Sequence, residues 1–192
     1  MRLSLLGSGA GSTVAAILDA VADGRIAADP ALVISNNSGA GVLEIAARHG
    51  VPTAHLSGAT HPDPDALDAA VLAALDGARS DLVVLAGYMK LLGPRVLAAY
   101  DGRVVNVHPA LLPAYGGRGM YGDRVHAAVL ADRASVTGAS VHVVTAEYDE
   151  GPVLAQVQVP VEPGDSVETL RARVQVAEKA LLVDWLAGWS RA

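Results

Sequence analysis

The chain contains no cysteine among its 192 residues. This absence excludes disulfide bonds, a thiolate nucleophile and cysteine-based zinc sites, and it gives no sign of a secreted protein. Basic residues are also few, since 14 lysines and arginines stand against 20 acidic residues and leave a formal net charge of −6. A fixed basic surface for nucleic acid is therefore not expected.

Long apolar runs are missing as well. A membrane-spanning helix needs about 20 consecutive apolar residues, and no stretch of the sequence reaches that length. The apolar start of the chain ends in glycine at Gly7, too early for a signal segment. We therefore expect a cytoplasmic protein with no membrane partner. Hydrophobic residues still make up 52% of the chain, and the length suits one domain covering residues 1–192.

Short apolar segments alternate with segments of helical periodicity in the first half of the chain. The apolar segments predict strands at residues 3–6, 31–34, 52–55, 81–85 and 104–108, and the periodic ones predict helices at 12–22, 41–49 and 62–75. Ser12 or Thr13 is the expected cap of the first helix. The strands lack polar alternation, as in a parallel sheet covered on both faces. This order predicts an α/β fold with an open, mostly parallel, twisted sheet and helices on both faces.

The second half has a different pattern. Two extended segments are expected at residues 140–144 and 153–160, joined by a turn-rich loop. A final helix is expected to begin near Ser166, which suits an N-cap. No linker separates the two halves, so we expect no domain boundary.

A glycine-rich loop, Gly7-Ser8-Gly9-Ala10-Gly11-Ser12, follows the first expected strand and precedes the first expected helix. Glycines let the backbone approach a ligand closely, and the N–H groups at a helix start favour an anion such as phosphate. The loop is not a dinucleotide fingerprint, because Ser12 occupies the third glycine position, and no lysine follows to make a Walker A loop. A tight turn without a ligand remains the alternative.

Asn106 and His108 lie two residues apart at the end of an apolar strand and therefore point to the same face. Open α/β sheets bind their ligands at this edge. An amide donor beside an imidazole suits acyl transfer, because the amide can stabilise an oxyanion and the imidazole can carry a proton or stabilise charge. The alternative is that both are polar strand-end groups bonded to nearby backbone.

Asp149 lies in a turn, where aspartate is common for local reasons alone. If the fold brings it to His108, its carboxylate would orient the imidazole and favour the protonated form. His142 could be a satisfied core group or could support the site, and His126 could reach it from a loop or helix start. The sequence has no H-E-x-x-H motif, so we expect no metal, and no G-x-S-x-G motif of a serine hydrolase.

Several segments together resemble a known family. They are Gly9-Ala10-Gly11-Ser12, residues 85–92 (LAGYMKLL), residues 106–113 (NVHPALLP), residues 138–144 (GASVHVV) and Asp149-Glu150-Gly151-Pro152. In these segments the chain resembles the phosphoribosylglycinamide formyltransferases, folate-dependent enzymes of purine synthesis, over nearly its whole length. The resemblance implies a Rossmann-like formyltransferase fold with 10-formyltetrahydrofolate as co-substrate and no metal.

The resemblance also implies residue roles. Asn106 and His108 would stabilise the tetrahedral oxyanion formed when the substrate amine attacks the formyl carbon, and Asp149 would pair with His108 and help move the released proton. The backbone of Met89, Lys90, Leu91 and Leu92, with Asn106, would hold the folate, and the loop 145–149 would close on it. Gly11, Ser12 and Thr13 would hold the substrate phosphate, with Gln175 and Glu178 facing the ribose or phosphate side.

Other readings stay open from the sequence. Thr13 stands where the family usually has asparagine, which leaves room for a formyltransferase acting on an amino sugar or a secondary metabolite. Two relatives with the same chemistry usually carry an extra domain. They are formyltetrahydrofolate deformylase, which transfers the formyl group to water, and methionyl-tRNA formyltransferase. A non-catalytic nucleotide-binding module would explain the glycine loop but not Asn106, His108 and Asp149. The expected partners are small-molecule substrates, without nucleic acid, and the expected state is a monomer or homodimer.

Overall fold

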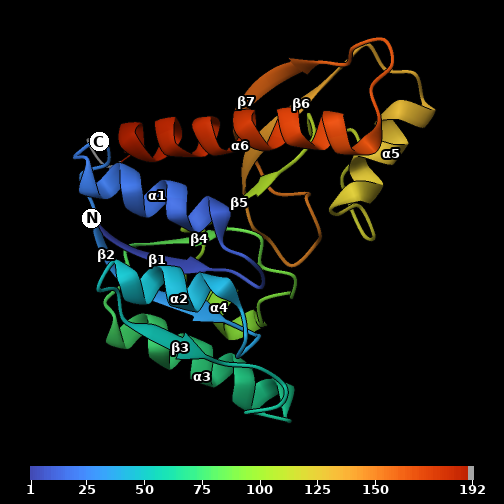
Figure 1. Ribbon diagram of the computed structural model, residues 1–192. Coiled ribbons are helices and arrows are strands. Elements are labelled where there is room, and N and C mark those ends of the chain that lie inside the picture. Colours follow the sequence, from blue (N-terminus) through green and yellow to red (C-terminus); the bar gives the residue numbers. More distant parts are fainter. Residues whose placement is uncertain (190–192) are drawn as a thin grey trace. The chain divides into compact units, whose positions relative to one another are not determined.

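The computed structural model describes residues 1–189 and shows an α/β fold (Figure 1). Its strands form a sheet in the order β3-β2-β1-β4-β5-β6-β7. The strands are β1 (Arg2–Leu6), β2 (Asp29–Ser35), β3 (Thr53–His55), β4 (Leu82–Leu85), β5 (Val104–His108), β6 (Val136–Val143) and β7 (Val153–Pro160). The helices are α1 (Ser12–Ala22), α2 (Gly41–Arg48), α3 (Pro64–Gly77), α4 (Pro94–Ala99), α5 (Asp123–Ala131) and α6 (Val167–Trp189). The predicted fold class is confirmed.

The contacts group the residues into two compact units. The first comprises Met1–Val105 and the end of α6 from Leu186, and the second comprises Asn106–Trp185. The expectation of one domain over residues 1–192 stays a prediction.

The first unit is a parallel sheet with helices on both faces. β1 pairs in parallel with β2 and with β4, and β2 pairs in parallel with β3. Connections between parallel strands are right-handed, so the change of direction at β1 places α1 and α2 on one face and α3 and α4 on the other. The contacts of α1 with α2, and of α3 with α4, agree with this placement. Apolar side chains of β1, β2 and β4 are almost fully buried, which explains why these strands show no polar alternation.

The first helix begins as predicted, but its predicted cap is wrong. The N-cap residue is Gly11, with φ of 82°, and no side chain caps the helix. Ser12 and Thr13 already lie inside the first turn. The left-handed backbone at Gly11 turns the chain sharply into α1, which glycine tolerates better than serine or threonine.

The second unit combines an antiparallel strand pair with two helices. β6 pairs antiparallel with β7, with Thr137 opposite Val159. A buried apolar cluster joins β7 to α5 and α6. Its residues are Val129, Val159, Leu170 and Val174, with Tyr115 and Leu130 among the side chains packed against them. Ser166 caps α6 as predicted, since its Oγ accepts a hydrogen bond from the Thr169 amide.

Parts of the fold have no clear signal in the sequence. α4 was not predicted, because six residues are too few to show a helical period. α5 was considered only as a possible helix start, because its N-cap is Gly122, without a side-chain cap. β6 also begins at Val136, four residues before the predicted start. Among residues 1–189, no helix is long and apolar enough to cross a membrane.

Candidate active site

The glycine-rich loop is fixed at the carboxyl ends of two strands. The Gly7 amide donates to the Ile34 carbonyl at 3.0 Å, and the Ser8 amide donates to the Gly87 carbonyl at 3.1 Å. The Ser8 hydroxyl accepts from the Met89 amide at 2.8 Å and donates to Asn36. Ser8 thus links the loops that follow β1, β2 and β4.

The start of α1 is suited to an anion. The first N–H groups of a helix have no partner within it and carry the positive end of its dipole, and α1 has no acidic residue in its first turn. Ser12 is exposed, and Gly11 and Thr13 are partly exposed. A Cβ at Gly11 would lie only 2.7 Å from Cα of Val42 in α2. Glycine at this position therefore allows both the turn and the close packing of α1 on α2.

A cavity of about 580 Å³ lies in the first unit between α3 and the loop after β4. Lys90, Leu91 and Leu92 line it on the loop side, and Leu67 and Val71 line it from α3. Met89 is not part of this lining, and its side chain is 55% exposed. Three of the five residues predicted to hold the folate therefore border one largely apolar cavity, whereas Met89 and Asn106 do not line it.

Asp68 was not predicted as a site residue from the sequence, yet it lines this cavity and binds the helix beside it. Its carboxylate is buried and accepts hydrogen bonds from the amides of Arg95 at 2.8 Å and Val96 at 3.2 Å. These amides belong to the first turn of α4, so the carboxylate caps that helix from α3. A Cβ at Gly93 would collide with the carboxylate, at 2.1 Å from its carbon.

In the second unit the structure brings together the three predicted catalytic residues. His108 Nδ1 lies 3.5 Å from Asp149 Oδ2, and the two side chains are only 4% and 11% exposed. His108 Nε2 lies 2.7 Å from the Tyr115 carbonyl oxygen. Asp149 has a left-handed backbone, with φ of 58°. Its carboxylate points towards Gly117 and accepts a hydrogen bond from the Gly117 amide at 2.9 Å.

His142 is a further member of this cluster. Its Nε2 lies 3.1 Å from Asn106 Nδ2 and 3.5 Å from Asp149 Oδ1, while its Nδ1 lies 3.0 Å from the Val143 carbonyl. A carbonyl can only accept, so Nδ1 carries the proton and Nε2 of the neutral ring accepts from the Asn106 amide. Burial lowers the pKa of His142, while the Val143 carbonyl and the Asp149 carboxylate oppose that shift.

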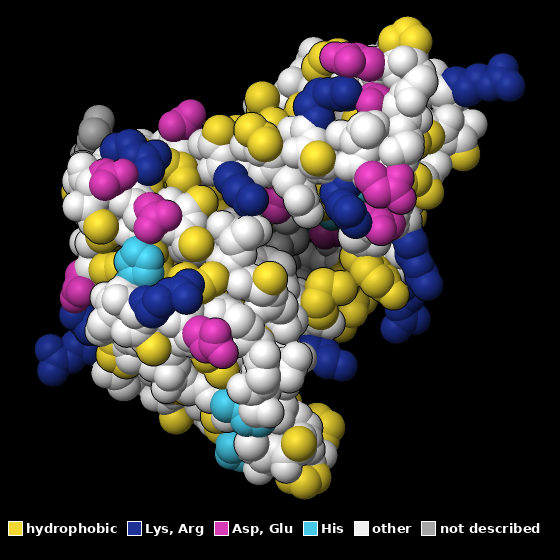
Figure 2. All heavy atoms as spheres, in the orientation of Figure 1, with side chains coloured by type: hydrophobic (Ala, Val, Ile, Leu, Met, Phe, Trp, Pro, Cys, Tyr) yellow, Lys and Arg dark blue, Asp and Glu magenta, His cyan; other side chains and the backbone are white. Residues whose placement is uncertain are grey.

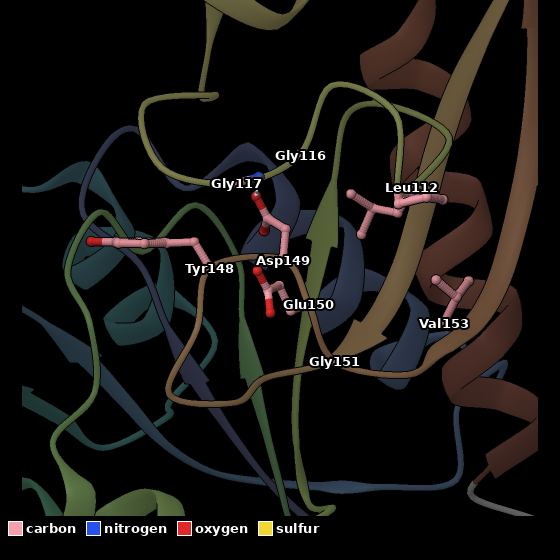
Figure 3. A pocket seen from close by; sticks show the side chains of 9 residues that line it. Leu112, Gly116, Gly117, Tyr148, Asp149, Glu150, Gly151 and Val153 are labelled. Atoms are coloured by element: carbon pink, nitrogen blue, oxygen red, sulfur yellow. Dashed lines mark hydrogen bonds between the residues drawn. The ribbon is translucent and has the colours of Figure 1, made fainter.

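A second cavity, of about 420 Å³, opens beside Asp149 (Figure 3). Figure 3 shows the Asp149 side chain pointing towards Gly117, with Tyr148 and Glu150 on either side of it in the chain. Leu112 and Val153 add apolar surface to the lining. A substrate atom placed in this cavity would lie next to the carboxylate that faces His108.

Two more predicted site residues lie on α6. Gln175 is exposed and Glu178 is partly buried. Burial raises the pKa of Glu178 to about 7, against an opposing effect of Lys179. Glu178 can therefore exchange a proton near neutral pH.

Together, the cluster in the second unit offers an amide donor, an imidazole and a carboxylate, and the carboxylate lines the second cavity. These groups can stabilise an oxyanion and move a proton without a covalent intermediate. Within residues 1–189, no group of three or more His, Cys, Asp or Glu residues could hold a metal ion.

Comparison with known proteins gives a consistent result. Residues 1–186 match the formyl transferase family. The chain is 44% identical over 182 residues to the phosphoribosylglycinamide formyltransferase of Mycobacterium tuberculosis, which covers 95% of this chain and 81% of that protein. It is 38% identical over 190 residues to the Escherichia coli enzyme of the same name, covering 97% of this chain and 87% of that protein.

Solved structures agree with these matches. Glycinamide ribonucleotide transformylase 1 from Symbiobacterium toebii superposes with a TM-score of 0.92 at 39% identity, covering all of this chain and 88% of that one. A formyltetrahydrofolate deformylase from Pseudomonas syringae superposes with a TM-score of 0.87 at 27% identity, covering 99% of this chain and 61% of that one. The chain therefore belongs to the formyl transferase family.

Proposed function

We propose that this chain transfers a formyl group from 10-formyltetrahydrofolate to the amine of phosphoribosylglycinamide. The observation that carries the proposal is the cluster of Asn106, His108 and Asp149, of which Asp149 lines a cavity, in a chain whose relatives bear that enzyme's name. Formyl transfer needs an oxyanion site and a proton path, and this cluster contains the groups for both.

In the proposed reaction the substrate amine attacks the formyl carbon and forms a tetrahedral intermediate with a negatively charged oxygen. Asn106 has two amide N–H groups, one of which faces His142, so the other can donate to that oxygen. His108 adds positive charge or a proton. The amine must lose a proton, which passes towards Asp149 as the bond to the folate nitrogen breaks and that nitrogen is protonated.

Substrate binding is proposed for both units. The main chain of Met89, Lys90, Leu91 and Leu92 would hold the folate ring, supported by the adjoining cavity. The start of α1, at Gly11, Ser12 and Thr13, would hold the phosphate. Gln175 and Glu178 of α6 would face the ribose or phosphate side.

The wider setting is also a proposal. We infer a cytoplasmic enzyme, monomeric or homodimeric, that binds small molecules and not nucleic acid. Two observations favour the last point: the net charge is −6, and Figure 2 shows basic side chains dispersed among acidic ones on the face in view. Nucleic-acid surfaces instead gather lysine and arginine.

A deformylase is the second candidate, because one of the structural relatives carries that name. The two functions differ in the acceptor, an amine or water. Purified protein is mixed with 10-formyltetrahydrofolate, and release of the deformylated folate is followed with no acceptor, with phosphoribosylglycinamide and with an amino sugar. Release only with phosphoribosylglycinamide supports the proposal, whereas equal release without an acceptor favours the deformylase. His108→Gln distinguishes an enzyme, which loses turnover, from a binding module, which has none to lose.

A further inference from the structure

The loop Tyr115-Gly116-Gly117 contacts both members of the His108–Asp149 pair through its main chain. The Tyr115 carbonyl oxygen lies 2.7 Å from His108 Nε2, and the Gly117 amide donates to Asp149 Oδ2 at 2.9 Å. The Gly117 main chain lies directly beside the Asp149 carboxylate (Figure 3). Two peptide groups of one short loop thus fix an imidazole and a carboxylate that come from distant parts of the sequence.

These contacts determine which nitrogen of His108 carries the proton. A carbonyl oxygen can only accept, so Nε2 must donate to Tyr115. Nδ1 is then the nitrogen that faces Asp149 Oδ2, at 3.5 Å. In the neutral ring Nδ1 has a lone pair and can take a proton, and in the charged ring it donates to the carboxylate. The hydrogen bond to Tyr115 therefore leaves Nδ1 as the nitrogen that exchanges protons on the Asp149 side.

The loop keeps this position although the backbone of Tyr115 has an unfavourable conformation. Tyr115 has a φ of 56°, in the left-handed region that side chains other than glycine, asparagine and aspartate rarely adopt. Such a conformation persists when surrounding contacts hold it. The Tyr115 ring packs against the buried cluster of Val129, Val159, Leu170 and Val174. Burial and the nearby Asp132, at the end of α5, also raise the pKa of its phenol.

Gly116, the next residue of the loop, has little room for a side chain. A Cβ at Gly116 would lie 2.5 Å from Cδ2 of Leu112 and 3.2 Å from Cβ of Asp149. A side chain at Gly116 would therefore displace Leu112 and make a tight contact with Asp149. The anchored ring at Tyr115 and the absence of a side chain at Gly116 together fix where the carbonyl and the amide point.

We propose that Tyr115 is a positioning residue: its ring, packed against the buried apolar cluster, holds its own carbonyl against His108 Nε2. The ring so selects the tautomer with the proton on Nε2 and the Nδ1 lone pair towards Asp149. The catalytic consequence rests on the proposed function, but the tautomer does not. Without the ring, the backbone can leave the left-handed region, the carbonyl turns away and His108 is no longer fixed in either tautomer.

The test measures the tautomer directly. Protein labelled with ¹⁵N-histidine is studied by long-range ¹H–¹⁵N NMR through a pH titration, and His108 is assigned from the signals lost in His108→Gln. Neutral His108 should carry its proton on Nε2 in the unaltered protein and in Tyr115→Phe, which keeps the ring. In Tyr115→Ala the two tautomers should mix. Tyr121→Ala, which removes an exposed ring from the same region, should leave the tautomer unchanged.

Turnover gives the second readout. Tyr115→Ala should lower kcat about 10- to 100-fold, the cost typical of a misplaced catalytic group, with KM changed by less than about threefold and with Tyr115→Phe close to the unaltered enzyme. Neutral His108 protonated on Nδ1, or a folded Tyr115→Ala with an unchanged tautomer, would overturn the proposal. If Tyr115→Ala does not fold, the unaltered protein still decides, because neutral His108 with its proton on Nδ1 would overturn the proposal. Absent turnover with the expected tautomer counts against the proposed function alone.

Discussion

Nε2 of His142 lies 3.1 Å from Nδ2 of Asn106, so the amide predicted to stabilise the oxyanion is held by a histidine of β6. The bond requires a neutral His142, because a protonated ring has no lone pair to offer. Burial lowers the pKa of His142 and keeps the ring neutral. The orientation of Asn106 therefore depends on the protonation state of a buried neighbour.

The pH dependence of stability tests this dependence. The folded protein disfavours protonated His142 while the unfolded chain accepts the proton readily, so its contribution is complete above the ordinary histidine pKa of about 6.5 and is lost as the pH falls below it. His142→Gln should therefore lose less stability between pH 7.5 and pH 5 than the unaltered protein. Urea unfolding at the two pH values measures the difference, with His61→Gln as the matched control. Equal losses in the His142 variant and the unaltered protein would contradict the account.

Asp149→Asn tests the proton path. The amide keeps an oxygen for the Gly117 N–H but cannot take a proton, so we expect kcat to fall about 100-fold or more with a modest change in substrate affinity. Steady-state kinetics measure kcat, and substrate titration measures the affinity. Asp101→Asn makes the same exchange at an exposed turn and should have near-normal kinetics. Unchanged kcat in Asp149→Asn would remove this carboxylate from the mechanism.

Two glycines of the same loop provide a matched pair. Gly11→Ala combines a φ of 82° with a Cβ only 2.7 Å from Val42 Cα, so it should lower the free energy of unfolding by about 1–3 kcal/mol. It should also raise KM for the phosphorylated substrate. Gly9→Ala introduces a Cβ with no atom within 4 Å and should change both quantities little. Chemical unfolding and initial rates compare the two, and similar behaviour of both variants would show that the close packing of α1 on α2 does not matter.

Asp68→Ala tests the support of the loop after β4. Removal of the carboxylate leaves the amides of Arg95 and Val96 without their acceptor, which should cost about 1–2 kcal/mol of stability. We expect KM for the folate to rise more than kcat falls, because α4 and the cavity wall loosen together. Asp65→Ala, an exposed change on the same helix, serves as the control. A folate KM equal to that of the control would limit Asp68 to a structural role.

The sequence was sufficient for the strand-end residues and for most of the sheet. Buried strands of a parallel sheet appear as unbroken apolar runs, which located β1, β2 and β4 to within a few residues. Asn106 and His108 could be predicted because two polar residues interrupt such a run at the edge where ligands bind. Asp149 was predicted only through the spacing of a known family, since a turn aspartate has no period of its own.

Other parts of the site could not be read from residue types. The partners of His108 and Asp149 include the carbonyl of Tyr115 and the amide of Gly117, and every residue type has these atoms apart from the amide missing in proline. The capping of α4 by Asp68 joins residues 27 and 28 positions apart, and the cap of α1 is a backbone conformation rather than a side chain. Tertiary contacts of this kind arise only when the elements pack.

The destination of the formyl group distinguishes transfer to phosphoribosylglycinamide from hydrolysis. Protein is mixed with 10-formyltetrahydrofolate carrying ¹³C in the formyl group and with phosphoribosylglycinamide, and the products are analysed by mass spectrometry. We predict that the label appears on the amine of phosphoribosylglycinamide, at a rate that His108→Gln or Asp149→Asn strongly reduces. Label released as formate, or label transferred equally fast by those variants, would contradict this prediction.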